Sequence, residues 1–518
     1  MASAGFMAAS TARPLSYGSI PEKLLPPFPR KRINLGLLAT IMSVGCVLVF
    51  LVAHTTPPSE ALAAIGGTAA IRMDVVTEDM LVEPKQIHLA YTEHTAGTGM
   101  TVSWTTYRRI DGSGVWFGET ADSLSTHVPA KVHTYYADDV YSLYTYHASL
   151  DGLTPLTTYF YSVGNESRVS PVYQFRTGRP PQTSDDETFE VAVYADFGER
   201  NAEATVQLVT QLKPRLEFIW HVGDISYADN AFHTLNQDNQ ALGFVYEKAY
   251  NAWMDSLGPV MREIPYMVTV GNHEAECYSP ACLYSQEKQR QLSNYSAFNT
   301  RFRMPANGVH NMWYSWVHGP VHFISISSET DYPDAPTNNK GTTVKNGEFG
   351  NQLAWLEATL AAVNRTLTPW VIVGGHRPLY GLKVYKPNGA PKKKHVALLA
   401  AFEPLFLKYK VDVVVSGHQH AYERHLPIRE SEPQLDGVSD DRSVYVAPTA
   451  PVYIVSGSCG SYDGHEPYVD IPAQTWNVLY DNVHFGISTL KANRTALHWE
   501  FLHSATGDPI DQFTMVKA

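Results

Sequence analysis

Short apolar runs separated by turn residues fill the chain between about residues 86 and 178. Within these runs apolar and polar positions alternate or cluster over three to six residues, and no helical period is present. Runs of this length and spacing predict β-strands packed as a small β-sandwich. The predicted strands are residues 87–89, 100–104, 115–117, 146–148 and 158–163.

The pattern changes after a polar, proline-containing linker at residues 178–186. From there on, apolar runs typical of buried strands alternate with stretches of helical periodicity, which predicts an α/β domain. A segment rich in Asn, Thr, Gly and Pro, residues 331–349, predicts a surface insertion in this domain. The predicted strands are 189–195, 217–221, 266–270, 322–327, 370–373 and 411–415, and the predicted helices are 202–212, 352–363 and 396–409.

An uncharged run of 19 residues, 35–53, lies near the start of the chain. It is close to the length of about 20 residues that spans a bilayer, and three basic residues, 30–32, lie shortly before it. By the positive-inside rule, residues 1–34 form a cytosolic tail and everything after a linker at 54–83 is lumenal. We favour a type II membrane anchor because the run exceeds a usual signal-peptide core. Cleavage near Ala63, with secretion, is the alternative.

The composition limits the number of domains and the kinds of binding partner. A chain of 518 residues with 44% hydrophobic and 17% charged residues predicts a folded protein of about two or three domains. The formal net charge of −12 gives no electrostatic reason to expect nucleic acid as a partner. Four glycosylation sequons, all after the apolar run, agree with a lumenal location. They begin at Asn165, Asn294, Asn364 and Asn493.

The four cysteines are too few to hold a chain of this length together. Cys277 and Cys282 are close enough in sequence to close a small loop, and in an oxidising compartment we expect a disulfide between them. Two unrelated thiols are the alternative.

Five short polar blocks, each directly after an apolar run, carry the candidate chemistry. At such positions an α/β sheet presents side chains to a ligand. The blocks contribute oxygen and nitrogen donors without a thiolate, a set that suits two hard or borderline metal ions. They are Asp196-Phe197-Gly198, Gly223-Asp224-Ile225-Ser226-Tyr227, Gly271-Asn272-His273-Glu274, Val373-Gly374-Gly375-His376 and Gly417-His418-Gln419-His420.

This ordered set resembles the purple acid phosphatases of the large plant type, within the calcineurin-like metallophosphoesterase superfamily. The resemblance implies a fibronectin III-like domain at 84–178. It also implies a four-layer αββα metallophosphoesterase domain at 188–518, closed by a segment from about residue 450. Its implied function is hydrolysis of small phosphate monoesters at acid pH by attack of a metal-bound hydroxide. The oligomeric state and the physiological ester stay open.

The resemblance also implies how the donors divide between the two ions. Asp224 bridges them. The third position of the first block is Gly198 rather than a ligand, and Tyr227 supplies the missing donor. A tyrosine in this role specifies Fe(III), because a phenol with a pKa near 10 is a poor ligand for a divalent ion. The implied Fe(III) ligands are Asp196, Asp224, Tyr227 and His420. The implied ligands of the second ion, which is Zn, Mn or Fe, are Asp224, Asn272, His376 and His418.

Two further histidines have candidate roles around this centre. His273 is interpreted as a phosphate contact, with orientation of a ligand as the alternative. The paired histidines that plant members place after the fourth block are missing here, so His395 is the candidate leaving-group acid or phosphate contact. A surface histidine at a helix start is the alternative for His395.

Two other functions remain open at this point. A phosphodiesterase or nucleotide pyrophosphatase on the same scaffold would have the same ligands, because the ligands do not define the leaving group. A membrane-tethered binding or adhesion protein with an inactive phosphatase domain would lack a ligand, and none is missing.

Overall fold

The computed structural model describes residues 78–92, 97–136, 142–181, 187–233, 245–278, 282, 284–336, 345–386, 388, 390–467 and 474–517. The predicted anchor at 35–53, its flanking tail and Ala63 lie outside these residues. In the part of the chain that is described, no helix has both the length and the apolar character needed to cross a membrane.

Two antiparallel sheets follow a short helix, α3 (Glu78–Val82), and form the predicted sandwich. Trp104 and Tyr146 are both buried in it, with ring centroids 5.3 Å apart. All five predicted strands are confirmed. In spatial order one sheet is β1 (Lys85–Tyr91), β2 (Gly99–Thr106), β6 (Tyr144–Asp151) and β5 (Lys131–His133). The other is β4 (Thr126–Pro129), β3 (Gly114–Gly118), β7 (Thr158–Asn165) and β8 (Arg168–Val169), with β9 (Tyr173–Arg176) also paired to β7.

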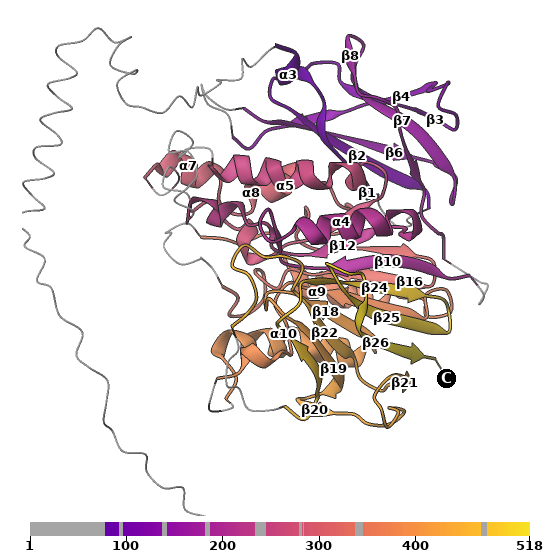
Figure 1. Cartoon of the computed structure of the whole chain (residues 1–518), viewed down its shortest axis with the longest axis vertical. Helices are drawn as coiled ribbons and strands as arrows, with labels where there is room; N and C mark the ends of the chain where they lie inside the picture. The colour runs from indigo at the N-terminus through magenta and orange to yellow at the C-terminus, as the bar shows by residue number, and fades with distance from the viewer. Residues whose placement is uncertain are drawn as a thin grey trace, which may run out of the picture. The chain divides into compact units, whose positions relative to one another are not determined.

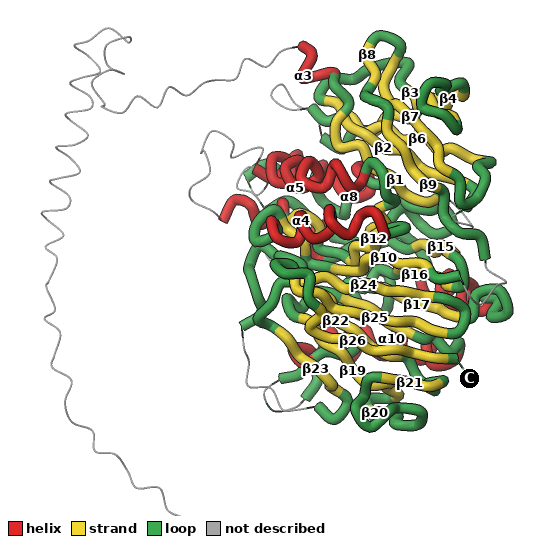
Figure 2. The backbone as a smooth tube through the Cα atoms, turned by 45° about the vertical axis from the view of Figure 1, so that its right-hand side comes forward, coloured by secondary structure: helices red, strands yellow, loops and turns green. Residues whose placement is uncertain are grey.

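The larger part of the chain is built on two mixed sheets (Figures 1 and 2). The first has the order β14 (Tyr266–Thr269), β12 (Ile219–Val222), β10 (Phe189–Tyr194), β24 (Gly486–Ala492), β25 (Ala496–His503), β26 (Pro509–Val516), β21 (Val444–Val446). The second has the order β15 (Tyr314–His318), β16 (Val321–Ser325), β17 (Trp370–Gly374), β18 (Val413–Ser416), β22 (Val452–Ser456), β19 (Tyr422–Arg429), β20 (Glu432–Pro433). β23 (Asn477–Asp481) also pairs with β19, and a two-residue pair joins β11 (Phe197–Gly198) to β13 (Ile225–Ser226).

The two sheets face each other and carry helices on their outer faces. On β12, Trp220 lies against Gly374 of β17, whereas its neighbour His221 has its ring 5.7 Å from Trp253 of α5 (Val245–Met261). The strand therefore alternates between the other sheet and a helix. In Figures 1 and 2, α5 and α4 (Glu203–Leu212) lie between the sandwich and the first sheet.

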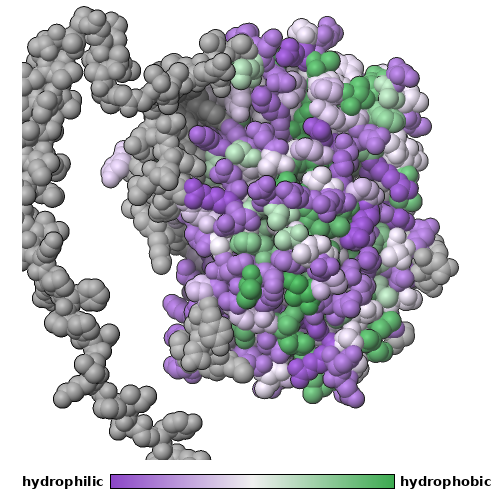
Figure 3. All heavy atoms as spheres, in the orientation of Figure 1, coloured by the Kyte–Doolittle hydropathy of each residue, from purple (hydrophilic) through white to green (hydrophobic). Residues whose placement is uncertain are grey.

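The second sheet alternates in the same way. Ile372 of β17 belongs to the core between the sheets, whereas Val371 and Val373 pack in a separate core with α9 (Gln352–Ala361) and α10 (Lys393–Lys408). The order helix, sheet, sheet, helix agrees with the predicted α/β sandwich. On the face drawn in Figure 3, hydrophilic residues are interspersed with small hydrophobic groups, as is usual for a surface in contact with water.

Three local predictions need correction. The 17-residue helix α5 is not among the predicted helices, nor are α7 (Gln286–Gln291) and α8 (Ser296–Arg301). Helix α10 begins at Lys393, three residues before its predicted start. The predicted insertion is not wholly a surface feature, because Asn346 is 5% exposed and its amide donates to Glu276 Oε1 at 2.8 Å. The remaining short elements are the 3₁₀ helices η1 (Lys213–Arg215), η2 (Ala228–His233), η4 (Asn272–Glu274) and η5 (Leu382–Val384).

The predicted disulfide is present. Cys277 and Cys282 are joined, and their Cα atoms are 5.9 Å apart. The bridge lies a few residues beyond the Asn272-His273 block, so it restrains the loop that follows the block.

A buried arginine joins the sandwich to the larger domain. Arg301 of α8 is fully buried, and its Nη2 lies 2.5 Å from Glu247 Oε2 of α5. Its Nη1 donates to Gln86 Oε1 of β1 at 3.1 Å, and its Nε donates to the Tyr135 hydroxyl at 3.0 Å. One cation therefore satisfies acceptors from both domains, which fixes how they pack.

We expect Glu217→Gln to reduce the loss of stability of the protein in acid. Burial alone would raise the pKa of Glu217, but hydrogen bonds from His318 and Arg179 outweigh it and lower the pKa from 4.5 to about 2. A carboxyl with a depressed pKa stabilises the fold above its unfolded pKa, and this contribution is lost as the pH falls towards 2. The contribution is about 3 kcal/mol at most.

Thermal unfolding measured at intervals from pH 6 to pH 2 checks this. The variant has the lower Tm at pH 6 but a smaller fall between pH 4.5 and 2. Glu187→Gln is the matched control, because Glu187 pairs with the same Arg179 but its side chain is 53% exposed. Equal pH profiles for Glu217→Gln and the wild type would contradict the assignment.

Candidate metal centre

Each of the five polar blocks lies at the carboxyl end of a strand, as the sequence predicts. Asp196, Asp224 and Asn272 come shortly after β10, β12 and β14, which are parallel neighbours in the first sheet. His376 and His418 come two residues after β17 and β18, parallel neighbours in the second sheet. The two sheets therefore bring all the blocks to one edge.

One group of donors gathers around Asp196. The Tyr227 hydroxyl donates to Asp196 Oδ1 at 2.9 Å and lies 3.0 Å from His420 Nε2. His420 Nε2 is itself 3.4 Å from the same Asp196 oxygen. His420 Nδ1 is near the Ser461 hydroxyl at 2.8 Å, so its Nε2 is directed towards Asp196 and Tyr227. An aspartate, a phenol and an imidazole thus converge on one point.

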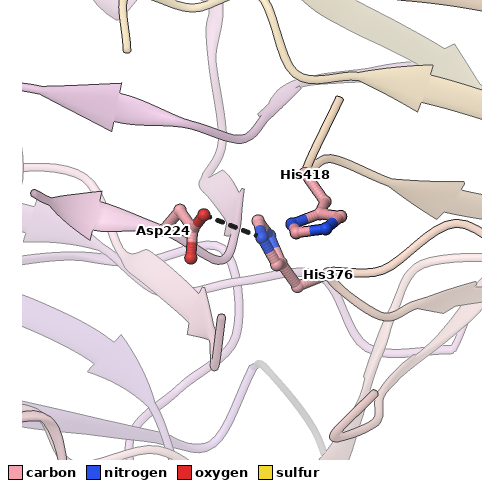
Figure 4. A group of neighbouring side chains, drawn as sticks. All are labelled: Asp224, His376 and His418. Carbon is pink, nitrogen blue, oxygen red and sulfur yellow. Dashed lines mark ion pairs between the residues drawn. The ribbon is translucent and has the colours of Figure 1, made fainter. Parts of the chain in front are cut away.

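A second group consists of Asp224, His376 and His418, whose donor atoms lie within 4.8 Å of one another (Figure 4). His376 Nδ1 lies 3.0 Å from the Val222 carbonyl oxygen and donates to it. In the neutral ring this leaves a lone pair on Nε2, which faces Asp224 Oδ2 at 2.9 Å. Two lone pairs that meet in a buried place need a positive charge there, which either a proton on Nε2 or a metal ion supplies. The donor set therefore fits a metal ion.

The electrostatics of these residues lead to the same conclusion. Burial opposes protonation of His376, but the Asp224 and Asp196 carboxylates outweigh it and raise the pKa of His376 to about 9. Burial and the neighbouring Arg377 guanidinium lower the pKa of His418 well below its ordinary value, so this ring is neutral and able to act as a ligand. The carboxylates of the site therefore strongly favour a positive charge at this place.

Asn272 joins the second group through an arginine. Arg377 Nη1 lies 2.8 Å from His418 Nε2, and Arg377 Nη2 donates to Asn272 Oδ1 at 3.2 Å. Arg377 Nε donates to the buried Glu329 carboxylate at 2.8 Å, which orients the guanidinium. Arg377 therefore places a fixed positive charge beside the second group. All seven residues predicted as ligands lie at this edge of the two sheets.

The backbone at the centre is unusual. Asp196, Asp224, Tyr227 and His418 all have left-handed backbone conformations, with φ between 53° and 68°. Such conformations cost free energy in residues other than glycine and cluster at functional sites. Four of the seven candidate ligands are held in this way.

Two glycines of the blocks leave the space that the ligands use. A Cβ on Gly417 would lie 2.3 Å from Asp196 Oδ2. A Cβ on Gly223, where φ is 85°, would lie 2.6 Å from His376 Nδ1. Each glycine thus permits a candidate ligand to approach the neighbouring loop closely.

Glu274 supports the site in a way that the sequence analysis missed. Its Oε2 accepts hydrogen bonds from the backbone amides of Asp224 and Gly271 at 3.0 and 2.7 Å, and its Oε1 accepts one from Ile225 at 2.7 Å. One buried carboxylate therefore holds the second and third blocks together. In the sequence, only the position of Glu274 next to His273 in the third block indicated that it could belong to the site.

His273 has a partner that the sequence analysis also missed. Its Nδ1 lies 2.8 Å from Asp229 Oδ2, while its Nε2 lies 3.7 Å from Asp224 Oδ2. Burial disfavours the charged ring, but Asp229 and then Asp224 outweigh it and raise the pKa of His273 to about 10. The ring is therefore a hydrogen-bond donor at acid pH.

His395 lies near the start of α10 but is not a surface residue, because it is only 4% exposed. It lines a cavity of about 220 Å³ together with Arg377 and His418. Burial lowers the pKa of His395 to about 4, opposed by a weaker contact with the Pro378 backbone. At higher pH the ring is neutral. The alternative of an exposed helix-start histidine is wrong.

Comparison with known proteins agrees with this fold and site. Residues 84–177 match a family model described as "Purple acid Phosphatase, N-terminal domain", and 189–422 match "Calcineurin-like phosphoesterase". Residues 450–512 match "Iron/zinc purple acid phosphatase-like protein C". A purple acid phosphatase from yellow lupin seeds has a similar fold, with a TM-score of 0.64 and 22% identity, covering 84% of this chain and 74% of the lupin chain.

Relatives of known function have similar sequences along most of their length. "Acid phosphatase type 7" of Mus musculus is 30% identical over 412 residues, which cover 77% of this chain and 82% of the mouse protein. "Acid phosphatase" of Aspergillus ficuum is 29% identical over 552 aligned positions, covering 87% of this chain and 88% of the fungal protein. "Fe(3+)-Zn(2+) purple acid phosphatase 12" of Arabidopsis thaliana is 25% identical over 437 residues, which cover 82% of this chain and 82% of the plant protein.

The paired sheets and the two groups of donors at their shared edge define a metallophosphoesterase. Within that class, the chain belongs to the purple acid phosphatase family.

Proposed function

We propose that this chain hydrolyses small phosphate monoesters at acid pH at a dinuclear centre of Fe(III) and a divalent ion. The observation that carries the proposal is the convergence of Asp196, Tyr227 and His420 beside the Asp224–His376–His418 group. A buried phenol next to an aspartate is a donor set suited to a hard trivalent ion, and the imidazoles with Asn272 suit a divalent one.

In this proposal Asp196, Tyr227 and His420 would hold Fe(III), and Asn272, His376 and His418 would hold Zn, Mn or Fe. Asp224 would be a ligand of both ions. When bound, the ions supply the Lewis acidity that activates water and neutralises phosphate charge.

The remaining residues of the site position the ester. His273, charged through Asp229, offers its Nε2–H to a phosphate oxygen. Arg377 adds a second fixed cation beside the same space, held in place by Glu329. Charge that develops on the phosphate in the transition state is stabilised by such pre-oriented donors. His395, neutral above pH 4, contacts the departing part of the ester by a hydrogen bond.

Monoesters and diesters separate the proposed function from the phosphodiesterase alternative. We expect the iron-loaded chain to hydrolyse p-nitrophenyl phosphate at pH 5 at least about tenfold faster than bis(p-nitrophenyl) phosphate, since two cations and a charged histidine favour the monoester, whose average negative charge is the larger. The reverse preference would favour a diesterase. No hydrolysis by the metal-bound chain would favour a binding protein.

Tyr227→Phe should remove visible absorption of the iron-loaded protein. Burial, and then the adjacent Asp196, raise the pKa of Tyr227 well above its ordinary value, so only a strongly Lewis-acidic ion would bind it as phenolate. The wild type is expected to show a broad charge-transfer band in the visible range, and the variant none. Spectra of both proteins with iron content measured in parallel provide the check.

Tyr295→Phe is the matched control, since Tyr295 is equally buried but belongs to neither group of donors. It should keep the band. A band of equal strength in Tyr227→Phe would remove Tyr227 from the iron ligands.

We also propose the domain limits 84–178 and 188–518, and an anchor at 35–53 that leaves the catalytic domain in the lumen or outside the cell. The Cys277–Cys282 disulfide supports an oxidising compartment. The four sequons support the same side of the membrane.

A further inference from the structure

We propose that the 220 Å³ cavity beside the metal centre binds a second anionic group of the substrate, so that the preferred phosphate esters have a leaving group with its own carboxylate or phosphate. The inference deepens the proposed function and rests on it, because it assumes that the scissile phosphate binds at the metal centre. Apart from His418, the residues that line this cavity have no part in holding the ions.

The cavity is an extension of the site itself. His418 lines it and belongs to the second group of candidate ligands, and Arg377, which also lines it, lies 2.8 Å from His418 Nε2. An ester whose phosphate lies against Arg377 can therefore direct its remaining atoms into the cavity. A volume of about 220 Å³ accommodates one small group rather than a large one.

The charge of the lining is opposite to that of the whole chain. The chain has a formal net charge of −12, yet four cationic side chains line this cavity against one carboxylate, Glu466. Lys383 is ion-paired with Glu466, and Arg377 with Glu329, which does not line the cavity, so the lining itself has an excess of positive charge. Cations gathered around a small cavity favour an anion in it. The four cations are Arg377, Lys383, Lys392 and Lys394.

Two buried polar groups in the lining have no hydrogen-bond partner among the described residues. Neither ring nitrogen of His395 has one, although the residue is only 4% exposed. Gln419 is 3% exposed, and its Oε1 accepts a hydrogen bond from the Lys383 amide at 3.0 Å, but its Nε2 has no partner. An unsatisfied buried donor costs free energy. A bound anion that accepts from Gln419 and from the neutral His395 ring would remove this cost.

Two esters that differ in one charge test the inference with the full iron-loaded chain at pH 5. We expect kcat/KM for 4-carboxyphenyl phosphate to be about tenfold that for its methyl ester, mainly through KM. Lys383→Gln is expected to lower this ratio about tenfold, and Glu466→Gln to raise it, because the two side chains have opposite charges. Lys386→Gln is the control, since this exposed lysine does not line the cavity, and it should keep the wild-type ratio.

A ratio of one or less in the wild type, or a ratio that Lys383→Gln does not change, would overturn the inference. Pyrophosphate as a second probe distinguishes a phosphate from a carboxylate as the preferred anion. If neither ester is hydrolysed, the proposed function is wrong, and a binding measurement then tests separately whether the cavity takes an anion. Calorimetric titration should show 4-carboxybenzylphosphonate binding about tenfold more tightly than its methyl ester, and equal binding would contradict the inference.

Discussion

Asp224→Asn is expected to lower kcat/KM for p-nitrophenyl phosphate by about a thousandfold or more. In the proposed centre this carboxylate belongs to both ions, and its oxygens already lie against His376 and the backbone amide of His273. Asparagine has nearly the same shape but no charge, so the loss reflects weaker binding of the ions rather than a cavity. Steady-state kinetics combined with metal content per chain measure the effect.

The fold should survive this substitution. Asparagine keeps an oxygen that can accept from the His273 amide, and it removes the charge that, after burial, raises the pKa of Glu274 to about 8. Unchanged circular dichroism together with lost metal would support the assignment. Asp441→Asn, at an exposed carboxylate that is hydrogen-bonded to the nearby Ser439 and Ser443, should retain both metals and full activity. Two bound ions and normal turnover in Asp224→Asn would exclude the bridging role.

Arg301→Leu is expected to destabilise the protein by about 3–5 kcal/mol, because it leaves the Glu247 carboxylate buried without its cation. Arg301 is 0% exposed and also supplies donors to Gln86 and Tyr135 of the sandwich. The loss therefore affects the packing between domains as well as one ion pair. The shift in the urea unfolding midpoint measures it.

Double substitution separates the charge from the packing. Arg301→Leu combined with Glu247→Gln should recover a large part of the lost stability, since no uncompensated charge stays buried. Arg109→Leu, at an exposed arginine whose partner is the exposed Asp111, should leave the midpoint unchanged. A midpoint in Arg301→Leu equal to that of the wild type would show that the network does not hold the domains together.

Strands and candidate ligands were predictable because both depend on local sequence. A buried strand is an apolar run, and a ligand at its carboxyl end is the polar residue that follows, as at Asp196 or His376. Helix α10 shows the limit of this approach. Its first turn, Lys393 to His395, is polar or titratable, so an apolar period detects the helix only from residue 396.

The supporting residues were not predictable because their roles depend on contacts across the fold. Glu274 holds the backbone at residues 224 and 225, about 50 positions away, and Arg377 contacts Glu329 and Asn272. Nothing in the residues next to Asp229 indicates that it meets His273, 44 positions later. A single sequence contains the residues of such pairs but not their distances.

The left-handed backbone at the candidate ligands has a consequence for the history of such proteins. Each of Asp196, Asp224, Tyr227 and His418 has a conformation that glycine adopts without strain, and the strain is about 1–3 kcal/mol for a residue with a Cβ. Selection for catalysis maintains this strain, and selection for rigidity alone would remove it. In a descendant of this chain that no longer needed its metals, glycine at Asp196 or Asp224 would relieve the strain, whereas glycine at Tyr227 would leave a cavity that costs about 3–5 kcal/mol. Glycine at the two aspartate positions would therefore indicate a related protein that has lost the enzyme activity but kept the fold.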